Sequence, residues 1–330
     1  MAHLRLLFDN FTLALLGVIA LASLLPCSGS GAVLFEWLTR LAIALLFFFH
    51  GARLSRAAII AGAGHWRLHL LVFACTFALF PLLGLALRPL LAPWLGAELY
   101  VGILYLCALP GTVQSAIAFT AMARGNLPAA VCSASASSIL GIFLTPLLVS
   151  LLLGAEAGSG STLEAIGRIL VQLLLPFLAG HLARPWLAGW VDRYKAWLKY
   201  VDQGSILLVV YTAFSAAVIG GLWRAVPGPA LVLLTLACCL LLAIALLATT
   251  WLSRRLGFSV EDEIAIVFCG SKKSLATGAP MAQVLFAGGA VGAVLLPLML
   301  FHQIQLMVCA VLAQRYARRA AAAEGSAALS

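Results

Sequence analysis

Charged residues are scarce in this chain. Only 9% of its 330 residues are Asp, Glu, Lys or Arg, whereas 64% are hydrophobic, and the mean hydropathy is +1.10. Soluble domains carry about 25% charged residues and about 45–50% apolar residues. Even a large hydrophobic core in a soluble protein would not account for this excess of apolar residues over charged ones. The composition therefore excludes an ordinary soluble enzyme, a disordered protein and a secreted disulfide-rich module.

The chain also lacks the residue spacings that hold metals or perform covalent catalysis. Seven of its eight cysteines lie inside apolar runs, and no Cys-x-x-Cys pair has a His partner. We interpret these cysteines as small packing residues and expect no metal site. No hydrolase elbow, zinc motif or phosphate loop occurs in a supporting context, so we expect the protein not to be an enzyme.

Long apolar runs are abundant instead. A transmembrane helix needs about 20 apolar residues, and the sequence predicts an all-α integral membrane protein with ten transmembrane helices in the lipid bilayer. The runs lie near residues 8–26, 33–50, 69–88, 98–123, 127–153, 163–183, 203–222, 229–251, 261–286 and 290–314.

Basic residues between these runs favour one orientation. With the N-terminus in the cytoplasm, fourteen Lys and Arg residues fall inside, and only Arg88 and Arg224 fall in the outer loops. Such a bias is typical of membrane orientation and not of nucleic-acid binding. We therefore expect a multi-pass protein of the cell membrane, the bacterial inner membrane, with both termini cytoplasmic and no nucleic-acid partner.

Two of the predicted spans are interrupted at corresponding positions. Polar and helix-breaking residues occur at 109–115 in the fourth span and at 268–274 in the ninth. Five spans per half give the halves opposite orientations, and paired interruptions of this kind are typical of secondary transporters. The sequence predicts two inverted five-helix repeats, at 1–153 and 154–315, with discontinuous, crossing helices 4 and 9. A frayed cytoplasmic tail follows at 316–330.

The interruptions supply the candidate substrate-binding residues. A half-helix that begins inside the membrane presents unpaired N–H groups and a positive dipole end, and lipid satisfies neither. A charge at this depth costs at least about 2.5–3.5 kcal/mol. The interruptions therefore favour an anionic solute, although one lysine could instead cap the carbonyl groups of the preceding half-helix. The candidates are Lys272, Lys273, Ser271, Ser274, Thr112, Gln114 and Ser115.

At these residues the chain resembles the bile acid:sodium symporter superfamily, above all its bacterial branch of ten-span proteins related to the seventh vertebrate member. The resemblance covers about residues 5–315, and it implies a panel domain packed against a core domain that contains the crossed helices. It is carried by the segments Phe47–Gly51 with Leu54 and Ser55, Leu109–Ser115, Ala123–Asn126 with Pro128–Ala130, Gly141–Pro146 and Gly270–Ala276 with Gly278, Pro280 and Met281.

The resemblance implies sodium coupling, but the residues disfavour it. Sodium-coupled members have a glutamate where this chain has Phe268, Ser and Thr ligands at the positions of Ala130 and Ala134, and a glutamine at that of Thr76. Two lysines nearby would repel sodium, which prefers oxygen ligands with a negative charge. A lysine in the place of the cation would leave a sodium-independent carrier, so we expect no cofactor unless a sodium ion binds.

A second group of polar residues could form an ion or proton site. Ser133 and Ser137 lie in the fifth span, Thr76 in the third, and His302 and Gln303 in the tenth. The alternative is structural: close helix packing by the serines and interhelical hydrogen bonds by the span-ten pair.

These features predict a secondary active transporter of a small organic anion that works by alternating access at the crossed helices. A cation/proton antiporter needs a titrating carboxylate at the crossing, and none is there. The alternative from another class is a non-transporting membrane sensor or regulatory protein. The sequence leaves open the substrate, the direction of transport and the coupling ion. It also leaves open the oligomeric state, for which a homodimer is one alternative.

Overall fold

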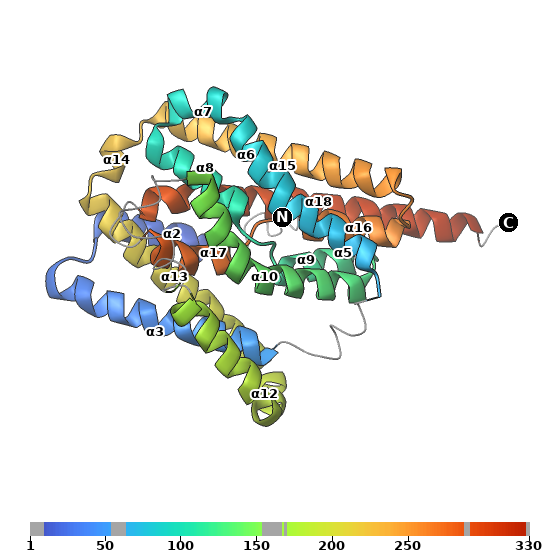
Figure 1. Ribbon diagram of the computed structural model, residues 1–330, viewed down its shortest axis with the longest axis horizontal. Coiled ribbons are helices and arrows are strands. Elements are labelled where there is room, and N and C mark those ends of the chain that lie inside the picture. Colours follow the sequence, from blue (N-terminus) through green and yellow to red (C-terminus); the bar gives the residue numbers. More distant parts are fainter. Residues whose placement is uncertain (1–9, 54–63, 154–166, 168–169, 287–290, 328–330) are drawn as a thin grey trace.

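The computed structural model describes residues 10–53, 64–153, 167, 170–286 and 291–327, and over these residues it is helical and contains no strand (Figure 1). The elements in chain order are α2 (Asn10–Leu24), α3 (Gly29–Arg53), α5 (Trp66–Ala74), η1 (Cys75–Leu79, a π-helix), α6 (Phe80–Ala86), α7 (Arg88–Leu95), α8 (Ala97–Ala108), α9 (Gln114–Met122), α10 (Leu127–Leu153), η3 (Leu170–Leu174, a π-helix), α12 (Leu175–Arg193), α13 (Lys195–Ile219), α14 (Leu222–Ala225), α15 (Gly228–Arg255), α16 (Val260–Gly270), α17 (Leu275–Leu285) and α18 (Val291–Ala327).

Six helical segments within the described residues are long and apolar enough to cross a membrane. They are Gly29–Arg53, Trp66–Ala86, Leu127–Leu153, Lys195–Ile219, Gly228–Arg255 and Val291–Arg319. Large apolar side chains cover much of their outer surface, as Leu247 at 71% exposure and Val232 at 62% illustrate. Lipid accepts such a surface and water does not. The protein is therefore an all-α, multi-pass membrane protein.

The other four predicted spans correspond to shorter helical elements. The first is the 15-residue α2, and the sixth consists of η3 and α12. The fourth and ninth are each divided into two helices, α8 with α9 and α16 with α17. The expected tail from residue 316 begins inside α18, which continues to Ala327, and the expected boundary between the repeats follows the end of α10. Leu54, Ser55 and the predicted boundary residue 154 lie outside the described residues.

Helices α2, α3, α12 and α13 pack on one another and are called here the four-helix layer. Helices α3 and α12 approach closely at two glycines. A Cβ atom added to Gly51 would lie 1.9 Å from the Phe177 carbonyl oxygen, and one added to Gly180 would lie 1.8 Å from the Phe48 carbonyl oxygen. Small residues at a helix crossing allow two backbones to come this near.

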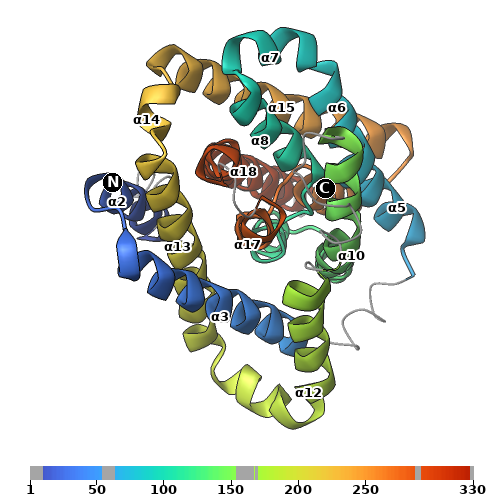
Figure 2. The same cartoon turned by 60° about the vertical axis from the view of Figure 1, so that its left-hand side comes forward.

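The remaining long helices form a larger group, called here the bundle, with α17 and α18 in its middle (Figure 2). Helix α13 of the layer contacts both α17 and α18. The start of α16 is fixed by Glu263, whose carboxylate accepts hydrogen bonds from Arg254 of α15 at 2.7 and 2.9 Å and from the Tyr316 hydroxyl of α18 at 2.7 Å. These contacts anchor the first turn of α16, and the second interruption follows the other end of this helix at Gly270.

Candidate functional site

The two interruptions lie against each other. The first separates α8 from α9 after Ala108, and the second separates α16 from α17 after Gly270. The Ser274 amide donates a hydrogen bond to the Pro110 carbonyl over 3.0 Å, and a Cβ on Gly111 would lie 3.0 Å from the Cys269 carbonyl oxygen. Segments that are about 160 residues apart in the sequence are therefore brought into one place, together with the predicted candidates that they carry.

Lys273 is fully buried and joins three parts of the bundle. Its ammonium group donates hydrogen bonds to the carbonyl oxygens of Thr76, Cys107 and Leu109 over 2.8, 2.9 and 2.7 Å. It also lies 4.2 Å from the centre of the Phe80 ring. An ammonium group has three N–H donors and a neutral amine has two. The three carbonyl acceptors match the three donors of the ammonium form.

The local sequence explains why these carbonyl groups are available. Helix α8 ends at Ala108, so its last carbonyls lack partners within the helix. In the π-helical turn η1, the Phe80 amide donates to Cys75, and the next position, Pro81, has no N–H to offer Thr76. Lys273 satisfies the resulting acceptors. Capping of helix carbonyls was the alternative considered for one lysine, but the carbonyls lie in η1, at the end of α8 and at Leu109, and not in α16, the half-helix that precedes Lys273.

Gln305 of α18 holds the backbone at Lys273 from the other side. Its carbonyl oxygen accepts from the Lys273 amide over 2.8 Å, and its side-chain amide donates to the Lys273 carbonyl over 2.8 Å. The same Gln305 nitrogen lies 2.9 Å from His302 Nδ1. Because both amide atoms of Gln305 are assigned by these backbone bonds, His302 Nδ1 is the acceptor in this contact.

Lys272 has different surroundings, although it is equally buried. Its ammonium group lies 3.3 Å from the Ser115 hydroxyl oxygen, and the Phe119 and Phe268 rings lie 4.4 and 5.5 Å away. Cation–π contacts of this kind stabilise a desolvated ammonium group. No ion pair joins Lys272 to a carboxylate within the described residues. Ser115 is thus its main polar neighbour, and Ser115 itself lines a cavity.

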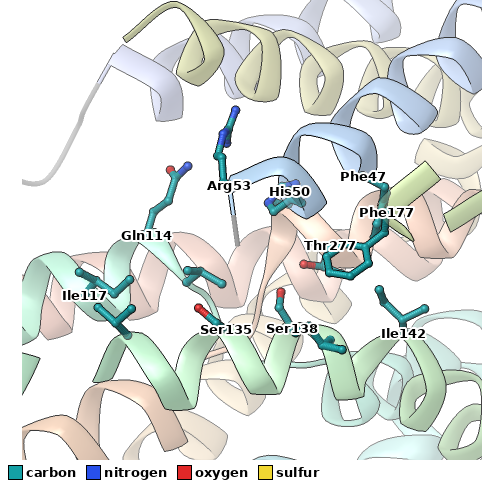
Figure 3. Close-up of a pocket in the computed structure, with 14 residues that line it drawn as sticks. Phe47, His50, Arg53, Gln114, Ile117, Ser135, Ser138, Ile142, Phe177 and Thr277 are labelled. Carbon is teal, nitrogen blue, oxygen red and sulfur yellow. The ribbon is translucent and has the colours of Figure 1, made fainter. Parts of the chain in front are cut away.

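The cavity lies between the four-helix layer and the bundle and has two chambers that share part of their walls. The apolar chamber has a volume of about 230 Å³ and the polar chamber about 340 Å³. Figure 3 shows the apolar chamber, with Phe47 of α3, Phe177 of α12 and Ile142 of α10 around it. The residues common to both chambers are His50, Val113, Gln114, Ser138, Ala276 and Thr277.

The polar chamber receives most of the predicted hydroxyl and amide candidates. Thr112, Gln114, Ser115 and Ser274 line it, as does His302. The first turns of α9 and α17 therefore form part of its wall, and α9 begins without a side-chain cap. Lys272, Lys273, Ser271 and Gln303 are not among its lining residues. Both lysines lie behind the cavity wall.

The other predicted residues make local contacts. Ser271 donates to the Val267 carbonyl over 2.6 Å at the end of α16. Ser137 accepts from the Gly111 amide over 3.1 Å, and Ser133 contacts His69 of α5 over 2.6 Å. The Thr76 hydroxyl donates to Val72 within its own helix. Ser271 and Ser137 therefore contact the interruptions directly, whereas Ser133 joins α10 to α5 and Thr76 bonds within its own span.

Four charged or titratable residues at the cavity were not predicted as site residues. Arg53 of α3 donates to both carboxylate oxygens of Asp202 of α13, over 2.5 and 3.2 Å. Lys199 lines the polar chamber, and His50, which lines both chambers, bonds through Nδ1 to the Leu46 carbonyl over 2.8 Å. The sequence identified Arg53 and Lys199 only as orientation signals. No sequence signal placed them at a site, because their position at the cavity depends on the packing of α3 against α13.

Relatives of this chain match it over most of its length. An uncharacterized protein of Pseudomonas aeruginosa is 71% identical over 97% of this chain and 96% of its own length. "Putative symporter YfeH" of Escherichia coli is 58% identical over 95% and 94%. Sodium/bile acid cotransporter 7 of Rattus norvegicus is 28% identical over 82% and 81%. These relatives carry the names of transporters where a function is named, and none carries the name of an enzyme.

The model of one transporter family matches residues 9–318, which is nearly the whole chain. This match includes both interruptions, the four-helix layer and all the residues that line the two chambers. The chain belongs to the SBF-like CPA transporter family.

Proposed function

We propose that this transporter carries a small organic anion by secondary active transport, using the cavity between the four-helix layer and the bundle. The observation that supports the proposal is the polar chamber, whose wall contains the first turns of α9 and α17 together with Lys199. Helix N-termini present a positive dipole end to an anion, and α9 also begins without a side-chain cap, whereas the Ser274 hydroxyl caps α17 by accepting from the Thr277 amide over 3.2 Å. The hydroxyl and amide groups of Thr112, Gln114, Ser115 and Ser274 add hydrogen bonds.

The apolar chamber indicates what the rest of the substrate is like. It adjoins the polar chamber through shared residues and is lined mainly by aromatic and aliphatic side chains such as Phe47, Phe177 and Ile142. An organic anion with its charged group in the polar chamber would place its hydrocarbon part here, where burial of apolar surface stabilises the complex.

Lys272 would act from directly behind the wall of the polar chamber. Its hydrogen bond to Ser115 is made with the hydroxyl oxygen, which also lies 2.7 Å from the Thr112 hydroxyl oxygen. When Thr112 donates in that contact, the Ser115 proton can point to an anion in the chamber. A positive charge in a region with little water also attracts an anion over several ångströms. We assign to Lys272 a role in substrate affinity and to Lys273 a role in holding the crossing.

Sodium coupling is not part of the proposal. The carbonyl groups of Thr76, Cys107 and Leu109 are the kind of oxygen cluster that holds a monovalent cation, and the Lys273 ammonium group occupies it. Repulsion by this charge disfavours a sodium ion nearby. The driving gradient would therefore belong to another solute.

The proposed architecture has ten spans in two inverted five-helix repeats, 1–153 and 154–315. The pairs α8–α9 and α16–α17 are its discontinuous fourth and ninth helices, supported by their matching interruptions and by the hydrogen bond from Ser274 to Pro110. The four-helix layer is the panel and the bundle is the core, and relative movement of the two gives alternating access. The basic residues support a cell-membrane protein with both termini in the cytoplasm.

A cation/proton antiporter fits the cavity less well. Asp202 is the carboxylate among the residues that line the polar chamber, and Arg53 holds both of its oxygens. A carboxylate in such a pair is already neutralised and is a poor cation ligand. The excess of basic groups around the cavity favours an anion.

Flux and binding test the proposal together. The purified protein in liposomes should accumulate or exchange a labelled organic anion, and a saturating anion at 100 times its Kd should stabilise the protein by about 2.7 kcal/mol. Lys272→Gln should weaken anion binding at least tenfold without changing the unfolding temperature of the unliganded protein by more than a few degrees. Arg255→Gln, which removes a positive charge from the exposed end of α15, is the matched control.

The outcomes separate two failures. Absence of both flux and stabilisation across a broad panel of organic anions would contradict the proposed function. Normal anion affinity in Lys272→Gln, with flux retained, would contradict the role of Lys272 and leave the anion cavity standing.

A further inference from the structure

The corner between α12 and α13 combines exposed aromatic and basic side chains. Within residues 184–200 it contains three of the eight tryptophans and two of the six tyrosines of the chain. All five are exposed: Trp186 by 82%, Trp190 by 40%, Tyr194 by 42%, Trp197 by 55% and Tyr200 by 71%. In Figures 1 and 2 this corner projects from the rest of the molecule, away from α17 and α18.

The aromatic rings form a connected cluster around Trp190. The rings of Phe49, Tyr194 and Trp197 lie 6.0, 5.2 and 6.3 Å from that of Trp190. Phe49 lies in the last turns of α3, which is a predicted transmembrane segment, so the cluster is at the level where that helix ends. Trp and Tyr gather at this level because their rings suit the boundary between acyl chains and headgroups.

The basic residues at the corner exceed the acidic ones. Arg184, Arg193, Lys195 and Lys199 lie in this stretch, and Asp192 is its one carboxylate. Lys195 hydrogen-bonds to Asp192 over 2.9 Å, which lowers the pKa of that carboxyl group and uses one of the positive charges. The Arg193 guanidinium lies over the Tyr194 ring at 5.9 Å. A net positive charge therefore remains beside the aromatic cluster.

Helix geometry places the two kinds of residue on common faces. Trp186, Trp190 and Arg193 are four and then three residues apart on α12, and Trp197 and Tyr200 are three apart on α13. Side chains at these spacings share one side of a helix. The α12 face therefore offers rings to the acyl-chain boundary and a cation to the headgroup layer, and the α13 face adds two more rings.

We propose that the α12–α13 corner is a binding site for anionic phospholipid headgroups of the cytoplasmic leaflet. Arg193 binds the headgroup phosphate together with Lys195, whose ion pair with Asp192 is solvent-exposed and weak enough to exchange for a phosphate. Trp186, Trp197 and Tyr200 lie among the adjoining glycerol and acyl groups. The occupant follows from charge complementarity, since a zwitterionic lipid carries its own cation beside the phosphate and has no net negative charge to balance these side chains. The leaflet follows from the proposed orientation, whereas the headgroup binding does not depend on the anion substrate.

The test uses the full chain in a neutral detergent, titrated with phosphatidylglycerol while the unfolding temperature is measured. We expect saturable stabilisation by phosphatidylglycerol and none by phosphatidylcholine or inorganic phosphate. The variant Arg193→Gln/Lys195→Gln should bind phosphatidylglycerol at least tenfold more weakly, since a basic residue near an anionic surface contributes about 1 kcal/mol. Raising the salt concentration should weaken the wild-type binding in the same direction.

Arg315→Gln/Arg318→Gln is the matched control, because both side chains are exposed on α18 and the change in net charge is the same. It should retain wild-type lipid affinity. Trp186→Ala/Trp197→Ala tests the aromatic part and should weaken phosphatidylglycerol binding, whereas Trp94→Ala on α7 should not. Equal stabilisation by phosphatidylcholine or by inorganic phosphate would overturn the proposal. So would equal loss of affinity in the two arginine-containing double variants.

Discussion

Two adjacent lysines in this protein have unlike partners, and the difference decides what each can do. Lys273 gives all three of its N–H groups to backbone carbonyls, whereas Lys272 contacts one hydroxyl and two aromatic rings. A fully coordinated ammonium group is a structural cation, since moving it leaves three buried acceptors unsatisfied. A partly coordinated ammonium group, such as that of Lys272, retains N–H donors that can bind another polar group. Substitutions at the two positions should therefore have different effects.

Lys273→Ala should convert the protein into one whose stability depends on a monovalent cation. Removing the side chain leaves three carbonyl oxygens and an empty volume, and each unsatisfied buried group costs about 1–3 kcal/mol. We expect a lower unfolding temperature in choline chloride and saturable recovery in sodium or potassium chloride. The wild type should show the same unfolding temperature in all three salts.

Lys273→Met is the control for volume, because its side chain fills the space that a cation would occupy. It should be destabilised like the alanine variant and should not respond to sodium or potassium. Saturable stabilisation of the wild type by sodium, or an alanine variant indifferent to every cation, would show that the ammonium group does not stand in for a bound cation.

At the scale of elements, the closest helix contact lies within the four-helix layer. Gly51 and Gly180 let α3 and α12 meet with backbone against backbone, and a Cβ at either position would overlap a carbonyl oxygen. Helix backbones cannot move aside as a flexible side chain can. This contact positions Phe47 and His50 of α3 opposite Phe177 of α12 at the apolar chamber.

Gly51→Ala and Gly180→Ala should each destabilise the protein by about 1–3 kcal/mol, because overpacking forces the two helices apart. Thermal unfolding in detergent would measure the loss. Gly189→Ala, also in α12 but with open space around its Cβ position, should be neutral or slightly stabilising. Wild-type unfolding temperatures for both variants at the crossing would contradict the close contact of α3 with α12.

At the scale of the whole molecule, the cysteines offer a test of orientation. Six of the eight are buried, and Cys239 is exposed on α15, whose outer surface is apolar. Cys27 lies between α2 and α3, next to the exposed Ser28, in a loop expected outside the cytoplasm. A thiol in lipid forms little thiolate and reacts poorly with charged reagents.

A membrane-impermeant maleimide should therefore label intact spheroplasts at Cys27, and Cys27→Ser should abolish the labelling. In that background, Glu261→Cys places a thiol at an exposed, polar position in the first turn of α16, which is expected on the cytoplasmic side, and it should react only after permeabilisation. The reverse pattern for the two sites would show that the proposed orientation is inverted.

Part of the candidate site was predictable from the sequence and part was not. Thr112, Gln114, Ser115 and Ser274 were identified because polar residues that interrupt an apolar run need partners other than lipid, and all four line the polar chamber. Arg53 and Asp202 were not identified, because their pairing depends on α3 and α13 lying side by side. Sequence spacing does not report such contacts.

The sequence by itself determined that this protein is helical and lies in a membrane. That information is local: an apolar run must satisfy its own backbone hydrogen bonds in lipid, and only a helix does so within one segment. The two interruptions were visible for the same reason. Only the tertiary structure decided which lysine caps the carbonyls of α8 and η1 and which lies next to Ser115. The two lysines are chemically identical neighbours, and their environments differ because distant helices supply the partners.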